Sequence, residues 1–193
     1  MSSEILLETE RLRLRQLNTD DINNLVALNS DPRVMEFIHP GSTSSVEKET
    51  RAVNGIRELC RNKPGFGVWA IETRAEGEFL GLALLKELYD TGENEVGYRL
   101  FPSAWGQGYA TEISRALVQH GFDSLGLDLI VGITFPGNDA SRRVLEKSGL
   151  KYHGERTYEQ CREIVPELSY FRIERPQFDL FYGRIATRKV FAP

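Results

Sequence analysis

One segment in the middle of the chain constrains the fold most, because it joins two strand-like runs through a glycine turn and a helix. Residues 95–100 have the pattern of a strand, and the hexapeptide WGQGYA follows at residues 105–110. A helical pattern continues from 109 to 125, and an apolar strand follows at 129–135. Two strands joined by a crossover helix lie parallel in one sheet. The sequence therefore predicts one parallel pair at this point of the sheet.

The glycine turn also predicts a site for an anion, most often a phosphate. Gly106 and Gly108 allow the backbone to approach a ligand closely. Amide groups in the first turn of a helix have no partner within the helix, and the helix dipole adds positive potential there. A plain strand-to-helix turn is the alternative interpretation of the glycines taken alone.

Composition and charge narrow the class of protein. A chain of 193 residues with 40% apolar and 27% charged residues is typical of one globular domain. Its net charge of -4 argues against nucleic acid as a partner. No apolar run is long enough to cross a bilayer, and the first residues lack the pattern of a secretory signal. Cys60 and Cys161 fit no metal or disulfide pattern, so we expect a cytoplasmic location and no membrane partner.

Hydrophobic periodicity predicts several strands around the central segment. Polar turns at residues 74–77 and 90–92 make the run from 67 to 100 an antiparallel meander. The expected strands are 11–17, 67–72, 79–88, 95–100, 129–135, 151–158 and 168–173.

Capping residues mark the starts of helices in the first third of the chain. A short helix is expected over residues 18–28, and Pro32 begins a second one. Ser44 and Glu47 fit a capping box that starts a longer helix, which continues to about Arg61. Near the other end, a helix that follows residue 138 should stop before a glycine.

Together these elements predict an α+β fold. The expected sheet is mixed, mostly antiparallel and twisted, with a central splayed parallel pair, and helices flank it. We expect one domain over residues 1–193, with its core over about 7–175 and the aromatic tail of 176–193 unplaced. That tail would close over a substrate or form the interface of a homodimer.

Two nucleotide-binding folds fit the glycine turn poorly. The dinucleotide fingerprint needs a third glycine where Thr111 stands, and its acid should end the next strand, whereas Asp128 precedes it. The strand should also feed directly into the first glycine, but five residues separate Leu100 from Gly106. A P-loop is excluded because no Gly-Lys-Ser/Thr follows.

Further motifs place the turn in a family. Residues 138–141 (NDAS) open the helix after the apolar strand, and residues 144–150 (VLEKSGL) close it. With residues 7–15 (LETERLRLR) and 96–100 (VGYRL), they resemble the GNAT superfamily of acetyl-CoA-dependent N-acetyltransferases. Within it, the chain is similar to the branch of ribosomal-protein-alanine N-acetyltransferases. The resemblance covers roughly residues 7–175, with the motifs in the family's order.

The resemblance implies acetyl-CoA as co-substrate, with the pyrophosphate of coenzyme A held by the loop amides. Trp105 stands where the family's loop usually begins with Arg or Gln, so a backbone cradle is expected there. Leu100 and Phe101 would offer backbone groups to the pantetheine arm, and Asn138 would hydrogen-bond it from the other side. The residues implied in cofactor binding are Leu100, Phe101, Gly106, Gln107, Gly108, Tyr109, Ala110, Thr111, Asn138 and Ser141.

Transfer to an amine needs a base for the amine and a hydrogen-bond donor for the leaving thiolate. Ser141 lies one turn after Asn138 on the same helix face and is the candidate donor. Many relatives use a tyrosine at the position aligned with Leu145, so Tyr152 is the fallback. Glu95, on the strand that leads into the loop, is the candidate base, provided that burial raises its pKa or a water relays the proton.

Other polar residues have weaker claims to the site. Glu36 and Glu159 are alternative bases. The three histidines share no metal-ligand spacing, so no metal is expected. The basic side chains that would reach the 3′-phosphate, or that are only solvated charges, are Arg142, Arg143 and Lys147.

The predicted function is direct acetyl transfer from acetyl-CoA to a primary amine, either a protein N-terminus, as on a ribosomal protein, or a small molecule. An α-amino group has a pKa of about 8 and lysine one of about 10.4, so an N-terminal amine needs less help from a base. The acceptor would bind over the helices of residues 18–61. The alternatives left open are an antibiotic or polyamine acetyltransferase and a non-catalytic acyl-CoA-binding sensor.

Overall fold

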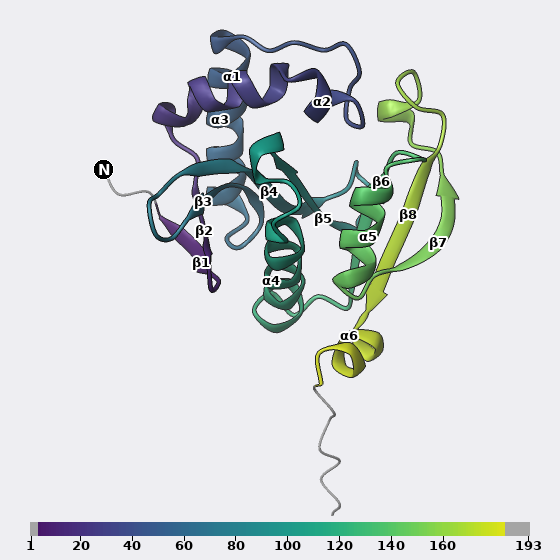
Figure 1. Cartoon of the computed structure of the whole chain (residues 1–193). Coiled ribbons are helices and arrows are strands. Elements are labelled where there is room, and N and C mark those ends of the chain that lie inside the picture. The colour runs from purple at the N-terminus through teal and green to yellow at the C-terminus, as the bar shows by residue number, and fades with distance from the viewer. Residues whose placement is uncertain (1–3, 184–193) are drawn as a thin grey trace, which may run out of the picture.

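A computed structural model describes residues 4–183, which form one eight-stranded sheet in the order β1-β2-β3-β4-β5-β6-β8-β7, flanked by helices (Figure 1). The strands are β1 (Ile5–Glu8), β2 (Leu12–Gln16), β3 (Gly67–Thr73), β4 (Phe79–Glu87), β5 (Asn94–Leu100), β6 (Leu129–Thr134), β7 (Lys151–Arg156) and β8 (Leu168–Glu174). The α-helices are α1 (Ile22–Ser30), α2 (Pro32–Met35), α3 (Val46–Asn62), α4 (Tyr109–Asp123), α5 (Asp139–Lys147) and α6 (Arg175–Phe181). Three short 3₁₀ helices are η1 (Thr19–Asp21), η2 (Pro102–Ala104) and η3 (Glu159–Cys161).

The predicted parallel pair is confirmed at the centre of an otherwise antiparallel sheet. Strands β5 and β6 run parallel, and all the other described neighbours run antiparallel. The β5–β6 pairing has one register pair in the described chain, Glu95 with Val131. The two strands therefore separate beyond that point, and the gap opens toward the glycine turn.

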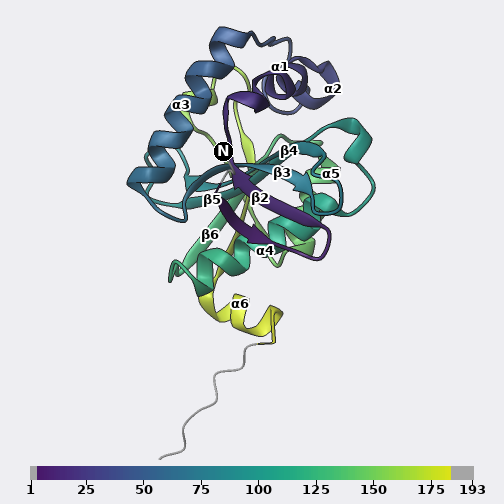
Figure 2. The ribbon, with the colours of Figure 1, turned by 90° about the vertical axis from the view of Figure 1, so that its left-hand side faces the viewer.

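Two layers of helices cover the two faces of the sheet (Figure 2). On one face, buried side chains of the strands pack with Ile113 and Leu117 of α4. On the other face, Leu17 and Ala70 pack with Leu25 of α1 and Val53 of α3. Strand β5 is therefore sandwiched between layers, and its successive side chains enter one layer and then the other.

One predicted helix start is wrong by a residue. The N-cap of α3 is Ser45, whose hydroxyl accepts from the Lys48 amide at 3.2 Å. Ser44, the predicted cap, instead donates its hydroxyl to the buried carboxylate of Glu49. The predicted start at Pro32 is confirmed, with Asp31 as the N-cap.

Both ends of the described chain contain elements that periodicity did not assign. Strand β1 pairs with β2, and α6 begins at Arg175 and continues into the tail that had no predicted structure. Phe178 of α6 is fully buried and stacks on Phe122 of α4, with ring centroids 4.3 Å apart. The tail beyond 183 lies outside the described residues. No helix among the described residues is both long enough and apolar enough to span a membrane.

Candidate active site

The glycine turn presents a row of backbone amides at the start of α4. Gly106 and Gly108 have φ of +74° and +81°, a region that other residues enter only with strain. Gly108 is the N-cap of α4, and space is open around a Cβ built at Gly106. Within the described chain, none of the amides from Gly106 to Thr111 has a hydrogen-bond acceptor. Such a row at a helix N-terminus fits the pyrophosphate of coenzyme A.

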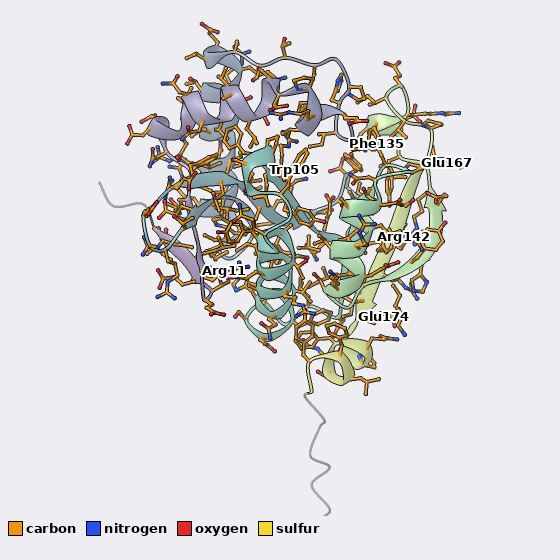
Figure 3. The ribbon with its side chains drawn as sticks, viewed as in Figure 1. Arg11, Trp105, Phe135, Arg142, Glu167 and Glu174 are labelled. Carbon is orange, nitrogen blue, oxygen red and sulfur yellow. The ribbon has the colours of Figure 1, made fainter. Side chains whose placement is uncertain are left out.

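The N-terminal motif contacts this turn, which sequence reasoning did not foresee. The Arg11 guanidinium donates to the Gln107 carbonyl at 3.0 Å and to the Glu112 carboxylate at 2.7 Å. It also lies over the Tyr109 ring, 4.6 Å from the centroid. Thr9 donates its hydroxyl to Glu112 at 2.6 Å. Arg11 therefore braces the loop from outside, on the left of α4 in Figure 3.

The brace is electrostatic as well as geometric. Burial would raise the pKa of Glu112, but the hydrogen bonds from Thr9 and Arg11 outweigh burial and lower that pKa. The carboxylate therefore stays ionised beside the N-terminus of α4, where negative charge is favoured. The only sequence signal for this contact is that the two motifs occur together.

A cavity of about 960 Å³ connects the loop with the gap between β5 and β6. Figure 3 labels Trp105, on its α4 side, and Phe135, which follows β6; both line the cavity. Helix α2 lines it through Arg33 and Val34, and Glu36 lines it just after the helix. The cavity thus touches the predicted cofactor loop and the helices expected to hold the acceptor.

Backbone groups of β5 face this gap in an alternating pattern. The Phe101 amide donates to the Leu80 carbonyl at 2.9 Å, so it points toward β4. Alternation in an antiparallel ladder then turns the backbone groups of Tyr98 and Leu100 toward β6. The Leu100 carbonyl already accepts from the Trp105 indole at 2.9 Å. Trp105 thus holds the strand end, and the predicted roles of Leu100 and Phe101 toward the pantetheine arm stay predictions.

Ser141 lies on the cavity wall with a partner that was not predicted. The Tyr98 hydroxyl is 3.1 Å from Ser141 Oγ and donates to the Ser141 carbonyl at 3.2 Å. Burial raises the pKa of Tyr98, against the pull of the hydrogen bond with Ser141, so the phenol stays protonated. Asn138 caps α5, its side-chain oxygen accepting from the Ser141 amide at 3.1 Å. Tyr98 belongs to the VGYRL motif, whose period-2 alternation points it to the α5 face.

The fallback donor for the thiolate lies elsewhere. Tyr152 is an exposed residue of β7 that donates to Glu155 at 2.8 Å, and it does not line the cavity. Leu145, where relatives would have a tyrosine, is buried against Gly132. Among the candidate donors, the structure brings only Ser141 to the cavity.

Glu95 lies in the cavity at the point where β5 and β6 part. Burial raises the pKa of Glu95 to about 7, against the opposing charge of Lys86, its register partner on β4. A carboxyl group with a pKa near the working pH can accept a proton efficiently. A pKa raised by burial was one of the two conditions under which Glu95 could act as the base, and burial at this position meets it.

The alternative bases are less enclosed. Glu36 is an exposed residue at the cavity edge, and Glu159 is outside the lining and pairs with Arg162 at 3.5 Å. Arg143 and Lys147 line the cavity, whereas Arg142 pairs with Glu146 at 3.0 Å. No group of His, Cys, Asp or Glu in the part of the chain that the structure describes could hold a metal ion.

A mixed sheet that opens beside an amide cradle, with a carboxyl and a hydroxyl group in the gap, fits the acyl-transfer site that the sequence predicts. A family model described as an acetyltransferase (GNAT) domain matches residues 11–151. The FsC-acetyl coenzyme A-N(2)-transacetylase of Aspergillus fumigatus is 33% identical over 154 residues, which are 76% of this chain and 65% of that protein. An uncharacterized N-acetyltransferase of Bacillus subtilis, YoaA, is 32% identical over 77% of this chain and 84% of that protein.

The fold has close counterparts among solved structures. A GNAT acetyltransferase from Bacillus anthracis superposes with a TM-score of 0.72 at 24% identity, covering 87% of this chain and 97% of that one. The chain belongs to the GNAT family and is an acetyl-CoA-dependent N-acetyltransferase.

Proposed function

We propose that the chain transfers the acetyl group of acetyl-CoA directly to a primary amine, either a protein N-terminus or the amine of a small molecule. The observation that carries this proposal is one cavity holding an unpartnered amide cradle, the Glu95 carboxyl and the Ser141 hydroxyl. When bound, acetyl-CoA supplies the activated acetyl group and the thiol that leaves. The residues of the chain position the acetyl group and the amine that accepts it.

Glu95 is the proposed base. Its pKa of about 7 leaves a large fraction ionised near neutral pH, and it lies beside the gap where the acetyl group would be presented. That pKa matches an α-amino group of about 8 better than a lysine of about 10.4. This match favours an N-terminal or similar α-amine. The name of the Aspergillus relative also specifies an N(2) position.

Ser141 and the backbone of β5 are proposed to stabilise charge. With Tyr98 donating to the Ser141 carbonyl, the Ser141 hydroxyl keeps its own proton for a leaving sulfur. The amides of Tyr98 and Leu100, which face the gap, can donate to an acetyl oxygen that gains charge, as oxyanion holes do. Gln107, Gly108, Tyr109, Ala110 and Thr111 would hold the pyrophosphate through their amides.

The location and oligomeric state follow as smaller proposals. Cys60 and Cys161 are free thiols, which suits a reducing cytoplasm. Leu180 and Phe181 are exposed on α6 and are the described residues of the aromatic tail from which a homodimer interface would be built.

An acceptor panel tests the proposed function. The full chain and acetyl-CoA are mixed with N-terminal peptides, small primary amines, aminoglycosides and polyamines, and thiol release is followed. Turnover of peptide or simple amine acceptors is expected. Activity on polyamines or aminoglycosides alone would contradict the acceptor class, and coenzyme A binding without turnover would indicate a sensor.

A further inference from the structure

Three positions of β5 face the layer of α1–α3, and they differ sharply in character. Glu95, Gly97 and Arg99 alternate with Val96 and Tyr98, so they share one face of the strand. The contact of Arg99 with Asn29 of α1 identifies that face. All three line the cavity. The Leu84 side chain of β4 lies over Gly97, its register partner, so the floor between the Glu95 carboxyl and the Arg99 guanidinium is apolar.

The guanidinium of Arg99 is held from behind by a buried polar chain. Arg99 donates to the side-chain oxygen of Asn29, and Asn29 donates its amide to Glu49 at 2.9 Å. The Glu49 side chain is only 4% exposed and also accepts from the Ser44 hydroxyl. This chain explains why Ser44 does not cap α3. It fixes one edge of the guanidinium and leaves the other toward the cavity.

Arg99 has more donors than partners. A guanidinium carries five N–H groups, and within the described residues Arg99 has one hydrogen bond, to Asn29. Burial lowers the pKa of Arg99, against the charge of Glu49, but an arginine stays charged. Arg99 is only partly buried and lines the cavity, so its remaining N–H groups can be reached by a ligand that offers paired acceptors.

We propose that Arg99 binds an anionic group of the amine acceptor, a carboxylate above all, and so selects acceptors that carry one. This inference rests on the proposed function, because it names the acceptor class for the same cavity. The planar fork of arginine pairs with a carboxylate through two parallel hydrogen bonds. Glu95 and Arg99 are four residues apart, roughly 13 Å along the strand, so the acceptor's amine and carboxylate are several bonds apart.

On the face of β5 toward α1–α3, the other charges around the cavity leave this role to Arg99, since Arg143 and Lys147 line the cavity from α5 on the side of the expected cofactor. Arg33 of α2 pairs with Asp31 at 2.6 Å, and Lys86 lies opposite Glu95 on β4. Glu49 lies behind Arg99, and Glu36 stands at the exposed edge. A fully cationic polyamine would meet the guanidinium without a counter-charge of its own.

Paired acceptors with and without a carboxylate test the proposal, and the first pair is also matched in size. The probes are 6-aminohexanoate against 6-aminohexanamide, and lysine against cadaverine. Binding to the full chain saturated with coenzyme A is measured by calorimetry, and kcat/KM is measured with acetyl-CoA. We expect the carboxylate acceptor to bind at least about 10-fold more tightly than its neutral match, the size of one good charge-assisted pair.

Variants separate recognition from support of the fold. Arg99→Gln should weaken the carboxylate acceptor at least about 10-fold more than the amide, and Arg99→Lys should recover part of the preference. Arg33→Gln, which removes an exposed arginine of the same cavity, should keep the preference. Circular dichroism melts and coenzyme A affinity show whether each variant is folded.

Each outcome decides one of the two proposals. Equal binding of both members of each pair by the wild type, or equal losses for both in Arg99→Gln, would overturn the role of Arg99 and leave it as a tether for α1. A binding preference that needs Arg99, without turnover of any amine, would support the anion site and reject the proposed transfer. Turnover of amines with no preference for the carboxylate would do the reverse.

Discussion

The two faces of β5 contribute to the cavity by different physical means. On the face toward α4 and α5, the site uses backbone amides, the N-terminus of α4 and the hydroxyls of Tyr98 and Ser141, which lie 3.1 Å apart. On the face toward α1–α3, it uses two ionisable side chains, Glu95 and Arg99, whose properties depend on burial and on residues far away. The face toward α4 and α5 is therefore suited to a ligand that does not vary, such as coenzyme A. The side chains on the face toward α1–α3 can differ from one protein to another without disturbing the amide cradle.

The largest expected effect is on the acceptor half. Glu95→Gln should lower kcat by about 10²-fold or more, the usual contribution of a general base, with little change in coenzyme A affinity. Because Glu95 must be ionised to accept a proton, wild-type kcat/KM should rise with pH through about 7 and the variant should lose that rise, when kcat/KM is expressed per neutral amine so that titration of the acceptor is removed. Initial rates between pH 5.5 and 8.5 measure both.

Glu36→Gln is the matched control, since it changes a carboxylate at the exposed edge of the same cavity. Its pH profile should match the wild type.

The pH dependence of the free energy of unfolding is a second measurement, and its sign follows from the raised pKa of Glu95. The folded chain keeps the Glu95 proton above pH 4.5, where the unfolded chain loses it, so this group makes stability fall as pH rises toward 7. A pH profile of Glu95→Gln that still rises through 7 would remove Glu95 as the base.

The next effect is on the cofactor half. Gly108→Val should weaken coenzyme A binding by about 10²-fold, because the left-handed φ is strained for valine and its Cβ would lie 3.5 Å from the Arg11 guanidinium, so the amides of the turn would shift. Calorimetry with coenzyme A measures this. Gly126→Val is the matched control, with φ of +70° and open space on a turn beyond α4. Both variants should lose stability, and only Gly108→Val should lose the ligand.

A smaller effect is expected at Ser141. Ser141→Ala should lower kcat by about 10-fold and leave coenzyme A affinity nearly unchanged, because one neutral hydrogen bond to the leaving sulfur is lost. Tyr98→Phe should have part of that effect, since its hydroxyl contacts Ser141. The double variant should be less than additive, as for residues that act together. Purely additive losses would mean that Tyr98 acts on its own.

The smallest effect should come from the brace outside the loop. Arg11→Gln should weaken coenzyme A binding only a few-fold, because partly exposed ion pairs contribute about 1 kcal/mol or less and Arg11 does not line the cavity. A double-mutant cycle with Glu112→Gln measures the coupling. Arg162→Gln, which removes an exposed pair with Glu159 at 3.5 Å and lies outside the cavity lining, is the control. Identical losses in both would show that the loop is not braced through Arg11.

The same contrast explains what could be predicted from the sequence. The cradle was predictable because glycine conformation and helix capping depend on a few adjacent residues, and strands such as β4 followed from alternation. The orientation of Arg99 was not predictable, because it depends on contacts between residues far apart in the sequence. Arg99 contacts Asn29, 70 residues away, and Asn29 contacts Glu49, 20 residues farther along the chain. Ser44 was misassigned for the same reason: its hydroxyl is used in a tertiary contact rather than by its own helix.

The single register pair between β5 and β6 leaves five strands on one side of the gap and three on the other. A molecule bound across the gap would then supply hydrogen bonds that β5 and β6 do not make with each other. It would connect the five-stranded and three-stranded parts of the sheet. Melting midpoints should climb with the concentration of coenzyme A, as mass action requires. Amide exchange should slow on both β5 and β6, even on β6 residues remote from the thiol, so ligands could be found by protection alone while the acceptor is unknown.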